Sequence, residues 1–331
     1  MKQIQPRLLS FFFAFFGIAL ATLVSFAESR SAVAPVPATD PDATASASVS
    51  VGFVVVPFIA TDKKGRPIRD LDKKEVTLRV EGRRVPLEFF DHNERSPVSF
   101  TILLDGSGSM GIAGKKEGAM AALAELVKRK LPKDEFALHV FASGEIRELV
   151  SFTEDGASVL RAAESVKPYG KTAFFDALAV MPGKSLVGQN GSRAIVLLTD
   201  GFDNASVLSA GQLASLLEGI DVPVYPLGLW TEGEETPAAS DKEARVDLDI
   251  LERIAKSSGG RLAVADTVEK LTKAIGAIER DLRTQYVTGF APSSSGEEKF
   301  RRIKVEVDRS DVKVRVRAGY RGTAPPSNGN R

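Results

Sequence analysis

Three oxygen-bearing side chains, Asp105, Ser107 and Ser109, alternate along a short glycine-containing stretch. They follow the apolar run 98–104 and precede a helical pattern, so we expect them on the turn that ends a buried strand. On such a turn, a carboxylate and two hydroxyls can all point at one spot. Oxygen donors of this kind suit a hard cation such as Mg2+, which binds few protein groups and keeps several waters. The motif therefore predicts a cation site.

A second apolar run, 194–199, ends in the same way, with Asp200 and Gly201. In a sheet of parallel strands, the carboxyl ends lie at one edge, and ligands bind where the strand order reverses. Two buried strands that end in carboxylates therefore predict a metal site at the carboxyl edge of an α/β sheet.

Gly106, Gly108 and Gly111 also match the dinucleotide fingerprint G-x-G-x-x-G. We reject this interpretation because Asp105 and Asp200 would repel a diphosphate that the helix amino terminus alone would attract. The acidic residue expected on the ribose is also missing from the end of the next strand, and the full phosphate-loop motif Gly-x-x-x-x-Gly-Lys-Ser/Thr does not occur. The sequence thus predicts no nucleotide.

The composition excludes several other classes of chemistry. The net charge of +1 gives no indication of nucleic-acid binding, and the absence of cysteine excludes thiol nucleophiles, disulfides and thiolate metal sites. His92 and His139 are too few for a histidine-rich transition-metal site. Any catalysis would have to use carboxylates and hydroxyls. A chain of 331 residues is long enough for one large domain and a smaller one.

The beginning of the chain has the pattern of a targeting segment. Lys2 and Arg7 precede the apolar run 8–26, and a small-x-small signature follows, so we interpret residues 1–27 as a cleaved signal peptide. The run is nearly long enough to span a bilayer, and a retained N-terminal anchor is the alternative. Either way, we expect an exported protein: periplasmic, in the cell envelope or secreted. Residues 28–47, rich in Ala, Pro and Ser, predict a flexible linker.

Hydrophobic periodicity divides the rest of the chain into four parts. Residues 48–96 predict a β module with strands at 49–55, 75–80 and 85–90, and residues 284–321 predict further strands that pair with them in one sandwich-like module. Residues 97–283 alternate strands with helices, which indicates a doubly wound, mostly parallel Rossmann-like sheet inserted in that module. The tail 322–331 is predicted to be disordered. The helices are expected at 119–127, 157–166, 172–181, 208–217, 248–257 and 268–283.

The polar motifs in their order resemble those of a known family. Asp105, Ser107 and Ser109, then Thr172 in Gly-Lys-Thr, then Asp200 in Leu-Thr-Asp-Gly are similar to the metal-ion-dependent adhesion site (MIDAS) of von Willebrand factor A (VWA) domains. The flanking segments resemble an exported bacterial group of VWA-related proteins common in acidobacteria. This likeness spans about residues 49–321.

The resemblance implies a metal site with these five residues. Ser107 and Ser109 would bind the cation directly, and Thr172 directly when a partner is bound and through water otherwise. Asp105 and Asp200 would act mainly through bridging water. The cation would be Mg2+, with Mn2+ or Ca2+ as alternatives, and an Asp or Glu carboxylate of a partner protein would complete its coordination. The resemblance also allows a shift of the last helix, 268–283.

We therefore expect an exported module for cation-dependent protein binding or adhesion, and not an enzyme. It would bind no nucleic acid and no nucleotide, and would meet a membrane only through a retained N-terminal segment. Two alternatives stay open: a metal-dependent hydrolase acting on phosphoesters, and a structural envelope protein with a stabilising cation. No His, Lys or Glu in the motifs is an obvious general base for the hydrolase.

Other polar residues have simpler interpretations. Asp203 and Asn204 are expected to shape a turn or cap a helix, although they could support the metal site. Asp176 is predicted on a helix face, and His139 in the packed core of a strand. The acidic loop 231–245 follows a central strand, which places it at the rim of the predicted site, where it could tune partner choice or simply be solvated.

Overall fold

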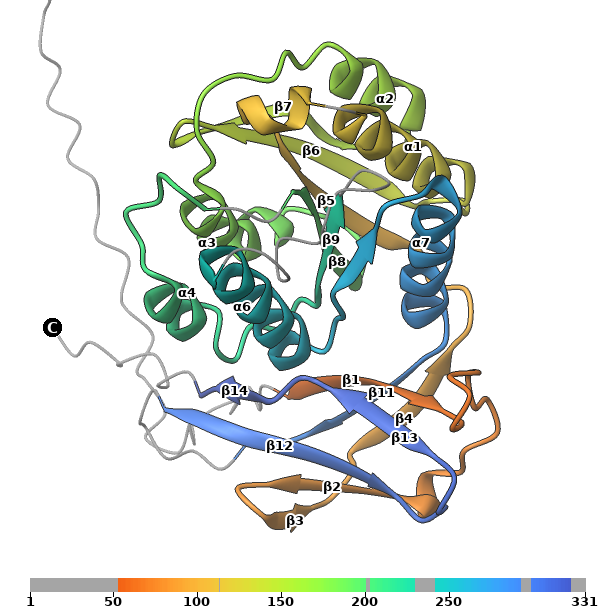
Figure 1. Ribbon diagram of the computed structural model, residues 1–331. Helices are drawn as coiled ribbons and strands as arrows, with labels where there is room; N and C mark the ends of the chain where they lie inside the picture. Colours follow the sequence, from red (N-terminus) through yellow and green to blue (C-terminus); the bar gives the residue numbers. More distant parts are fainter. Residues whose placement is uncertain (1–52, 113, 201–202, 230–241, 293–298, 323–331) are drawn as a thin grey trace, which may run out of the picture. The chain divides into compact units, whose positions relative to one another are not determined.

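The computed structural model describes residues 53–112, 114–200, 203–229, 242–292 and 299–322 (Figure 1). The predicted signal peptide, the linker, most of the loop 231–245 and nearly all of the tail lie outside these residues. No helix in the described ranges combines the length and the apolar character needed to cross a membrane.

The described part of the α/β domain is built on a six-stranded sheet. Every neighbouring pair is parallel except β6 and β7, which form an antiparallel hairpin at one edge. The first strand of the domain, β5, pairs with β6 on one side and with β8 on the other, so the strand order reverses between β5 and β8. In spatial order the strands are β10 (Ala263–Ala265), β9 (Val224–Leu229), β8 (Ser192–Thr199), β5 (Val98–Asp105), β6 (Glu135–Ala142) and β7 (Glu145–Thr153).

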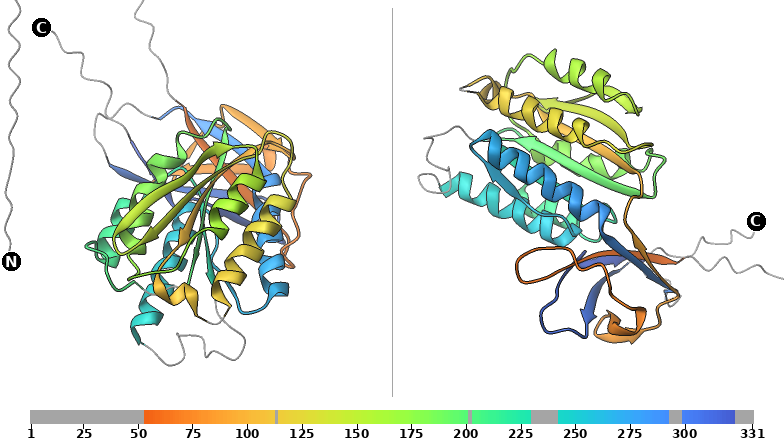
Figure 2. Two further views of the ribbon diagram at one scale, coloured as in Figure 1. Left: turned by 90° about the horizontal axis from the view of Figure 1, so that it is seen from above. Right: turned by 90° about the vertical axis from the view of Figure 1, so that its right-hand side faces the viewer.

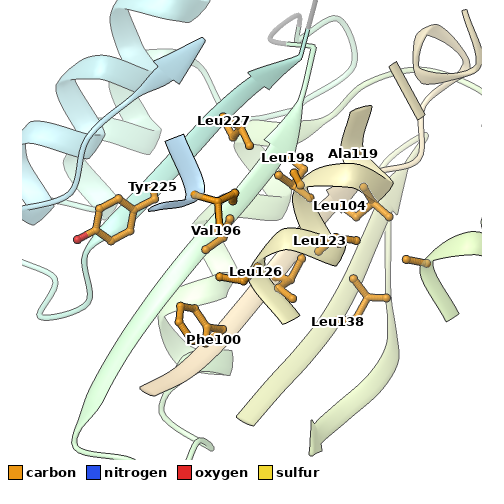
Figure 3. Close-up of a cluster of buried hydrophobic side chains, with 14 of the residues drawn as sticks. Phe100, Leu104, Ala119, Leu123, Leu126, Leu138, Val196, Leu198, Tyr225 and Leu227 are labelled. Carbon is orange, nitrogen blue, oxygen red and sulfur yellow. The ribbon is translucent and has the colours of Figure 1, made fainter. Parts of the chain in front are cut away.

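Helices cover both faces of this sheet (Figures 1 and 2). Every residue of β5 and β6 is buried, as expected for strands with a helix layer on each side. Successive β5 side chains alternate between the layers. Phe100 and Leu104 pack towards α1 (Figure 3), and Leu103 packs towards α3. One layer holds α1 (Lys115–Lys128), α2 (Gly156–Glu164) and α7 (Val268–Arg283), and the other α3 (Phe174–Ser185), α4 (Ala210–Leu216) and α6 (Lys242–Ser258).

All six predicted helices are present, and the end that differs most is the beginning of α6, which lies at Lys242 and not at 248. The end of α3 also differs. The helix predicted at 172–181 begins at Phe174 and continues through Pro182 to Ser185. A proline removes only one helical hydrogen bond, and Met181 and Ser185 on either side of it are both fully buried. Packing therefore carries the helix past the residue that the sequence pattern takes as its end.

The N- and C-terminal strands together form the predicted β module, whose two sheets enclose a separate apolar core. β1 pairs antiparallel with β11, and β2 pairs antiparallel with β12. Each sheet therefore combines strands that precede the α/β domain in the chain with strands that follow it. The fold class is therefore confirmed: a doubly wound sheet inserted in a small sandwich-like module. One sheet holds β13 (Lys313–Val316), β1 (Val54–Thr61), β11 (Gln285–Phe290) and β4 (Phe89–Asn93), and the other β14 (Gly319–Arg321), β12 (Phe300–Val307), β2 (Val76–Val80) and β3 (Arg83–Val85).

One strand prediction in this module is wrong. The run 85–90 is not a single strand: β3 ends at Val85 in one sheet, and β4 begins at Phe89 in the other. Pro86 has no backbone N–H to continue a ladder, and the chain crosses between the sheets there. The Glu88 amide then donates to the Gly289 carbonyl at 2.9 Å, which begins the pairing with β11.

A buried ion pair ties the end of α7 to the beginning of the sheet. Arg283 Nη1 donates to Asp134 Oδ1 at 3.0 Å and to the Ser96 carbonyl at 2.6 Å, and both side chains are almost fully buried. Asp134 in turn accepts from the backbone amides of Val98 and Leu131. This pair therefore holds the passage from the β module into β5.

Arg283→Met should lower the free energy of unfolding by about 3–5 kcal/mol, because it leaves the Asp134 charge buried without a partner. Arg161→Met is the matched control: it breaks an exposed pair with Asp155 and should cost less than about 1 kcal/mol. Urea unfolding of both variants measures the difference. Equal losses would show that the buried pair contributes no more than a surface one.

Candidate metal centre

The structure places Asp105 and Asp200 at one edge of the sheet. Asp105 is the last residue of β5, Asp200 directly follows β8, and these two strands are adjacent and parallel. Their carboxyl ends meet where the strand order reverses, which is the place where open α/β sheets bind ligands. Both side chains are buried, at 2% and 1% exposure.

The Asp105 carboxylate is held by two hydrogen bonds. Its Oδ1 accepts from the Ser107 amide at 2.8 Å, and its Oδ2 accepts from the Thr199 hydroxyl at 2.7 Å. Burial and, next, the negative charge of Asp200 raise the pKa of Asp105 to about 6, against the lowering effect of these hydrogen bonds. The site therefore holds two mutually repelling carboxylates in a poorly solvated place.

The negative charge of the Asp200 carboxylate is only partly balanced by its neighbours. Its Oδ2 lies 3.4 Å from the Nζ of Lys115, a buried residue at the beginning of α1. Its Oδ1 is shielded from solvent and has no hydrogen-bond partner among the described residues. A buried carboxylate oxygen without a partner is costly, and it marks a place where a cation or a donor is expected. Lys115 is absent from the residues that the sequence motifs predict, although its place in the first turn after the serine motif is a usable signal.

Ser107 and Ser109 present their hydroxyls side by side. Their Oγ atoms lie 3.0 Å apart, on a loop that forms a short 3-10 turn at Gly108–Gly111. Ser107 is buried, whereas Ser109 is half-exposed, so this side of the site opens towards solvent.

Backbone hydrogen bonds bring the loop of Thr172 to the same place. The Gly108 amide donates to the Gly170 carbonyl at 3.0 Å, which joins this loop to the serine loop. The Thr172 amide donates to Asn204 Oδ1 at 3.0 Å, and the Asn204 amide donates back to the Thr172 carbonyl at 3.0 Å. The three motifs are thus tied together, and Asn204 supports the site by holding the backbone of Thr172.

Gly170 is required by this arrangement. Its φ of +71° favours glycine, and a Cβ there would lie 1.9 Å from the Ser143 hydroxyl oxygen. That hydroxyl accepts from the Lys171 amide at 3.1 Å.

Asp176 and Asp203 position the loop after β8. Asp176 accepts from the backbone amides of Val207 and Leu208 at 2.8 and 2.9 Å. Asp203 accepts from the Phe175 amide at 2.9 Å, near the beginning of α3. Asp176 therefore anchors a loop from its helix face, and Asp203 helps to begin a helix.

The donor set fits a hard cation. It offers two carboxylates whose repulsion a cation would relieve, a buried oxygen of Asp200 without a partner, and the adjacent hydroxyls of Ser107 and Ser109. No imidazole joins it: His139 is buried within β6, as predicted, and burial lowers its pKa. No group of three or more His, Cys, Asp or Glu side chains within the described residues could hold a metal ion, so any cation here would depend on the hydroxyls.

Comparison with known proteins agrees with this architecture. Residues 100–202, which include the segments of all five predicted ligands, match the von Willebrand factor type A domain. This part of the α/β unit therefore matches a VWA domain, which agrees with that part of the predicted resemblance. No curated protein matches the chain.

Several solved structures are similar. A von Willebrand factor type A protein from Catenulispora acidiphila is 14% identical, with 73% of this chain and 75% of that chain covered and a TM-score of 0.46. An aerotolerance-related membrane protein from Bacteroides fragilis, carrying multiple mutations to serine, is 26% identical over 56% and 98% of the chains, with a TM-score of 0.42. The PilB minor pilin from Streptococcus sanguinis is 14% identical over 57% and 62%, with a TM-score of 0.43.

The raised pKa of Asp105 predicts how stability depends on pH in the presence of a chelator. Because the folded-state pKa of about 6 lies above the ordinary 3.8, the folded protein keeps a proton that the unfolded chain releases. The free energy of unfolding should therefore fall by about 2 kcal/mol between about pH 4 and pH 6 relative to Asp105→Asn, which has no such proton. Urea unfolding of both proteins across this range tests it. Parallel pH profiles would contradict the prediction.

Proposed function

We propose that this VWA domain is a binding module that recognises a partner protein through a divalent cation. The observation that carries the proposal is the pair of buried, neighbouring carboxylates, Asp105 and Asp200, beside the paired hydroxyls of Ser107 and Ser109. Such a set, rich in neutral donors, would leave a bound cation electrophilic.

Each residue has a separate task in this proposal. Ser107, Ser109 and Thr172 would offer hydroxyl oxygens, and the two aspartates would supply the negative charge that attracts the ion. When bound, Mg2+ would supply a positively charged coordination position for an Asp or Glu carboxylate of the partner. Mn2+ or Ca2+ could take the same place. The hydrogen bonds from Ser107 and Thr199 keep the Asp105 carboxylate oriented in the absence of the partner.

Two exposed apolar side chains beside the site suit a protein partner. Ile112 is 60% exposed, and its amide donates to the Ser109 carbonyl. Tyr169 is 43% exposed, and its amide donates to the Gly106 carbonyl. Large apolar or aromatic residues around a polar centre are typical anchors of protein interfaces. They would provide contact area around the partner's carboxylate.

The hydrogen bonds and the ion pair around the two aspartates favour binding over catalysis. A hydrolase would need a general base free to take a proton. Here Asp105 is engaged by Ser107 and Thr199, and Asp200 lies against the Lys115 ammonium. We propose that the protein is exported and not enzymatic, and the export rests on the signal pattern at 1–27.

Metal binding itself is tested with Mn2+, whose free form is measured by electron paramagnetic resonance. Asp200→Ala should weaken Mn2+ binding about tenfold or more, because it removes half of the charge that holds the ion. Asp311→Ala, at an exposed turn, is the matched control and should bind like the native protein. Equal Mn2+ affinity in all three proteins would refute the metal site.

Partner capture tests the function. The purified protein should recover a partner from an extract of the native cell envelope in Mg2+, and should lose it in chelator or as the Asp105→Ala variant. Equal recovery of every partner with Mg2+ and with chelator would overturn the cation bridge. If the chelator or the Asp105→Ala substitution changes only the melting temperature and not the recovered partners, a structural cation is favoured instead.

A further inference from the structure

A second site lies at the opposite end of the central strands. A cavity of about 780 Å³ is lined by residues of β1, the end of α3, the beginning of β8 and the strands β13 and β14. It includes Arg193, the second residue of β8, whereas Asp200 follows the last residue of that strand. At about 3.3 Å per residue, the two ends of β8 are roughly 20 Å apart. The cavity is therefore separate from the metal centre.

Arg193 and Arg317 both line this cavity. In each guanidinium group, several N–H donors have no hydrogen-bond acceptor from the described residues. Arg193 Nη2 donates to the Gly188 carbonyl at 3.2 Å, and Arg317 Nη2 donates to the Val55 carbonyl at 2.8 Å. The Nε of each is buried, with no hydrogen-bond partner in the described part of the chain. Arg317 is only 6% exposed. Each guanidinium has five N–H donors, so most of them remain available.

The other charged residues along the cavity do not neutralise Arg193 and Arg317. Arg315 pairs with Asp281, and Arg321 lies 3.8 Å from Glu218. The acidic residue in the lining is Asp221, an exposed side chain whose charge acts on Arg317 without a close ion pair. Within the described ranges, neither Arg193 nor Arg317 forms an ion pair. The cavity is therefore positively charged.

Apolar side chains complete the lining. Phe53 is 52% exposed, Val55 45% and Leu186 58%. A cavity of this volume lies in the usual range for small-molecule sites, which combine apolar walls with a few polar groups that fix orientation. Exposed apolar groups beside the guanidiniums of Arg193 and Arg317 suit a molecule with an anionic end and an apolar body.

Burying a guanidinium without a counter-ion is unfavourable, and burial lowers the pKa of Arg317. An anion would supply the missing charge, and guanidinium groups bind carboxylates and phosphates through paired N–H donors. We infer that this cavity binds a small amphiphilic organic anion, with its acidic group at Arg193 and Arg317 and its apolar part against Phe53 and Leu186. The site does not depend on the cation at Asp105 and Asp200.

Two fluorescent probes test the inference. 8-Anilinonaphthalene-1-sulfonate carries an anionic group on an apolar body, and N-phenyl-1-naphthylamine has the same body without the charge. Arg193→Gln and Arg317→Gln should each weaken binding of the sulfonate about tenfold and leave binding of the neutral probe unchanged. Arg84→Gln, an exposed arginine in β3, is the matched control and should change neither.

Further measurements separate charge recognition from a folding defect. Arg193→Lys keeps the charge but loses the paired N–H donors, so it should regain only part of the affinity, and a chelator should have no effect in any variant. Decanoate and decyl phosphate should displace the sulfonate probe better than decanol, and whichever anion is stronger identifies the preferred acidic group. If decanol competes equally well, or if native sulfonate affinity persists in both glutamine variants, the anion site is refuted.

Discussion

Two carboxylates that repel each other, Asp105 and Asp200, are buried at the ends of neighbouring parallel strands. Parallel pairing of β5 with β8 brings them to the same edge of the sheet, and both side chains are almost fully buried. Neighbouring side chains partly offset this repulsion: the Thr199 hydroxyl donates a hydrogen bond to Asp105, and the Lys115 ammonium lies against Asp200. The remaining imbalance, an Asp200 oxygen without a partner, is what gives the site its affinity for a cation in our proposal. The meeting of two carboxylates at this edge is thus a consequence of sheet topology.

The loops around this pair form a frame built mainly from backbone contacts. Gly108 bonds to Gly170, and Thr172 bonds to Asn204, so three segments distant in sequence are held together without using the hydroxyls assigned to the cation. In our proposal, such a frame would keep the predicted ligands in place before an ion arrives, which would lower the ordering cost of binding. Neutral side chains could then suffice, because their positions are set by the backbone and not by a metal.

At the opposite edge, the α/β domain meets the β module through polar contacts of a different kind. The Ala318 amide donates to the Ser257 carbonyl at 2.7 Å, and Arg315 pairs with Asp281 of α7. These contacts bring several arginines to the beginning of β8, and two of them have no counter-ion among the described residues. The molecule therefore has opposite charge imbalances at the two ends of the same strands: negative at the carboxyl edge and positive at the amino edge.

The sequence by itself determined the alternation of strands and helices, the split β module and the motif residues at the strand ends, because apolar periodicity and turn chemistry are local. It did not determine which contacts hold those residues. Lys115 reaches Asp200 across 85 positions, and Asn204 supports Thr172 across 32, distances over which no local pattern carries information. The break of the predicted strand 85–90 and the extension of α3 past Pro182 were likewise decided by packing. Only the tertiary structure brought Arg193 and Arg317 to one cavity, because the lining of that cavity depends on how β8 and the C-terminal strands meet.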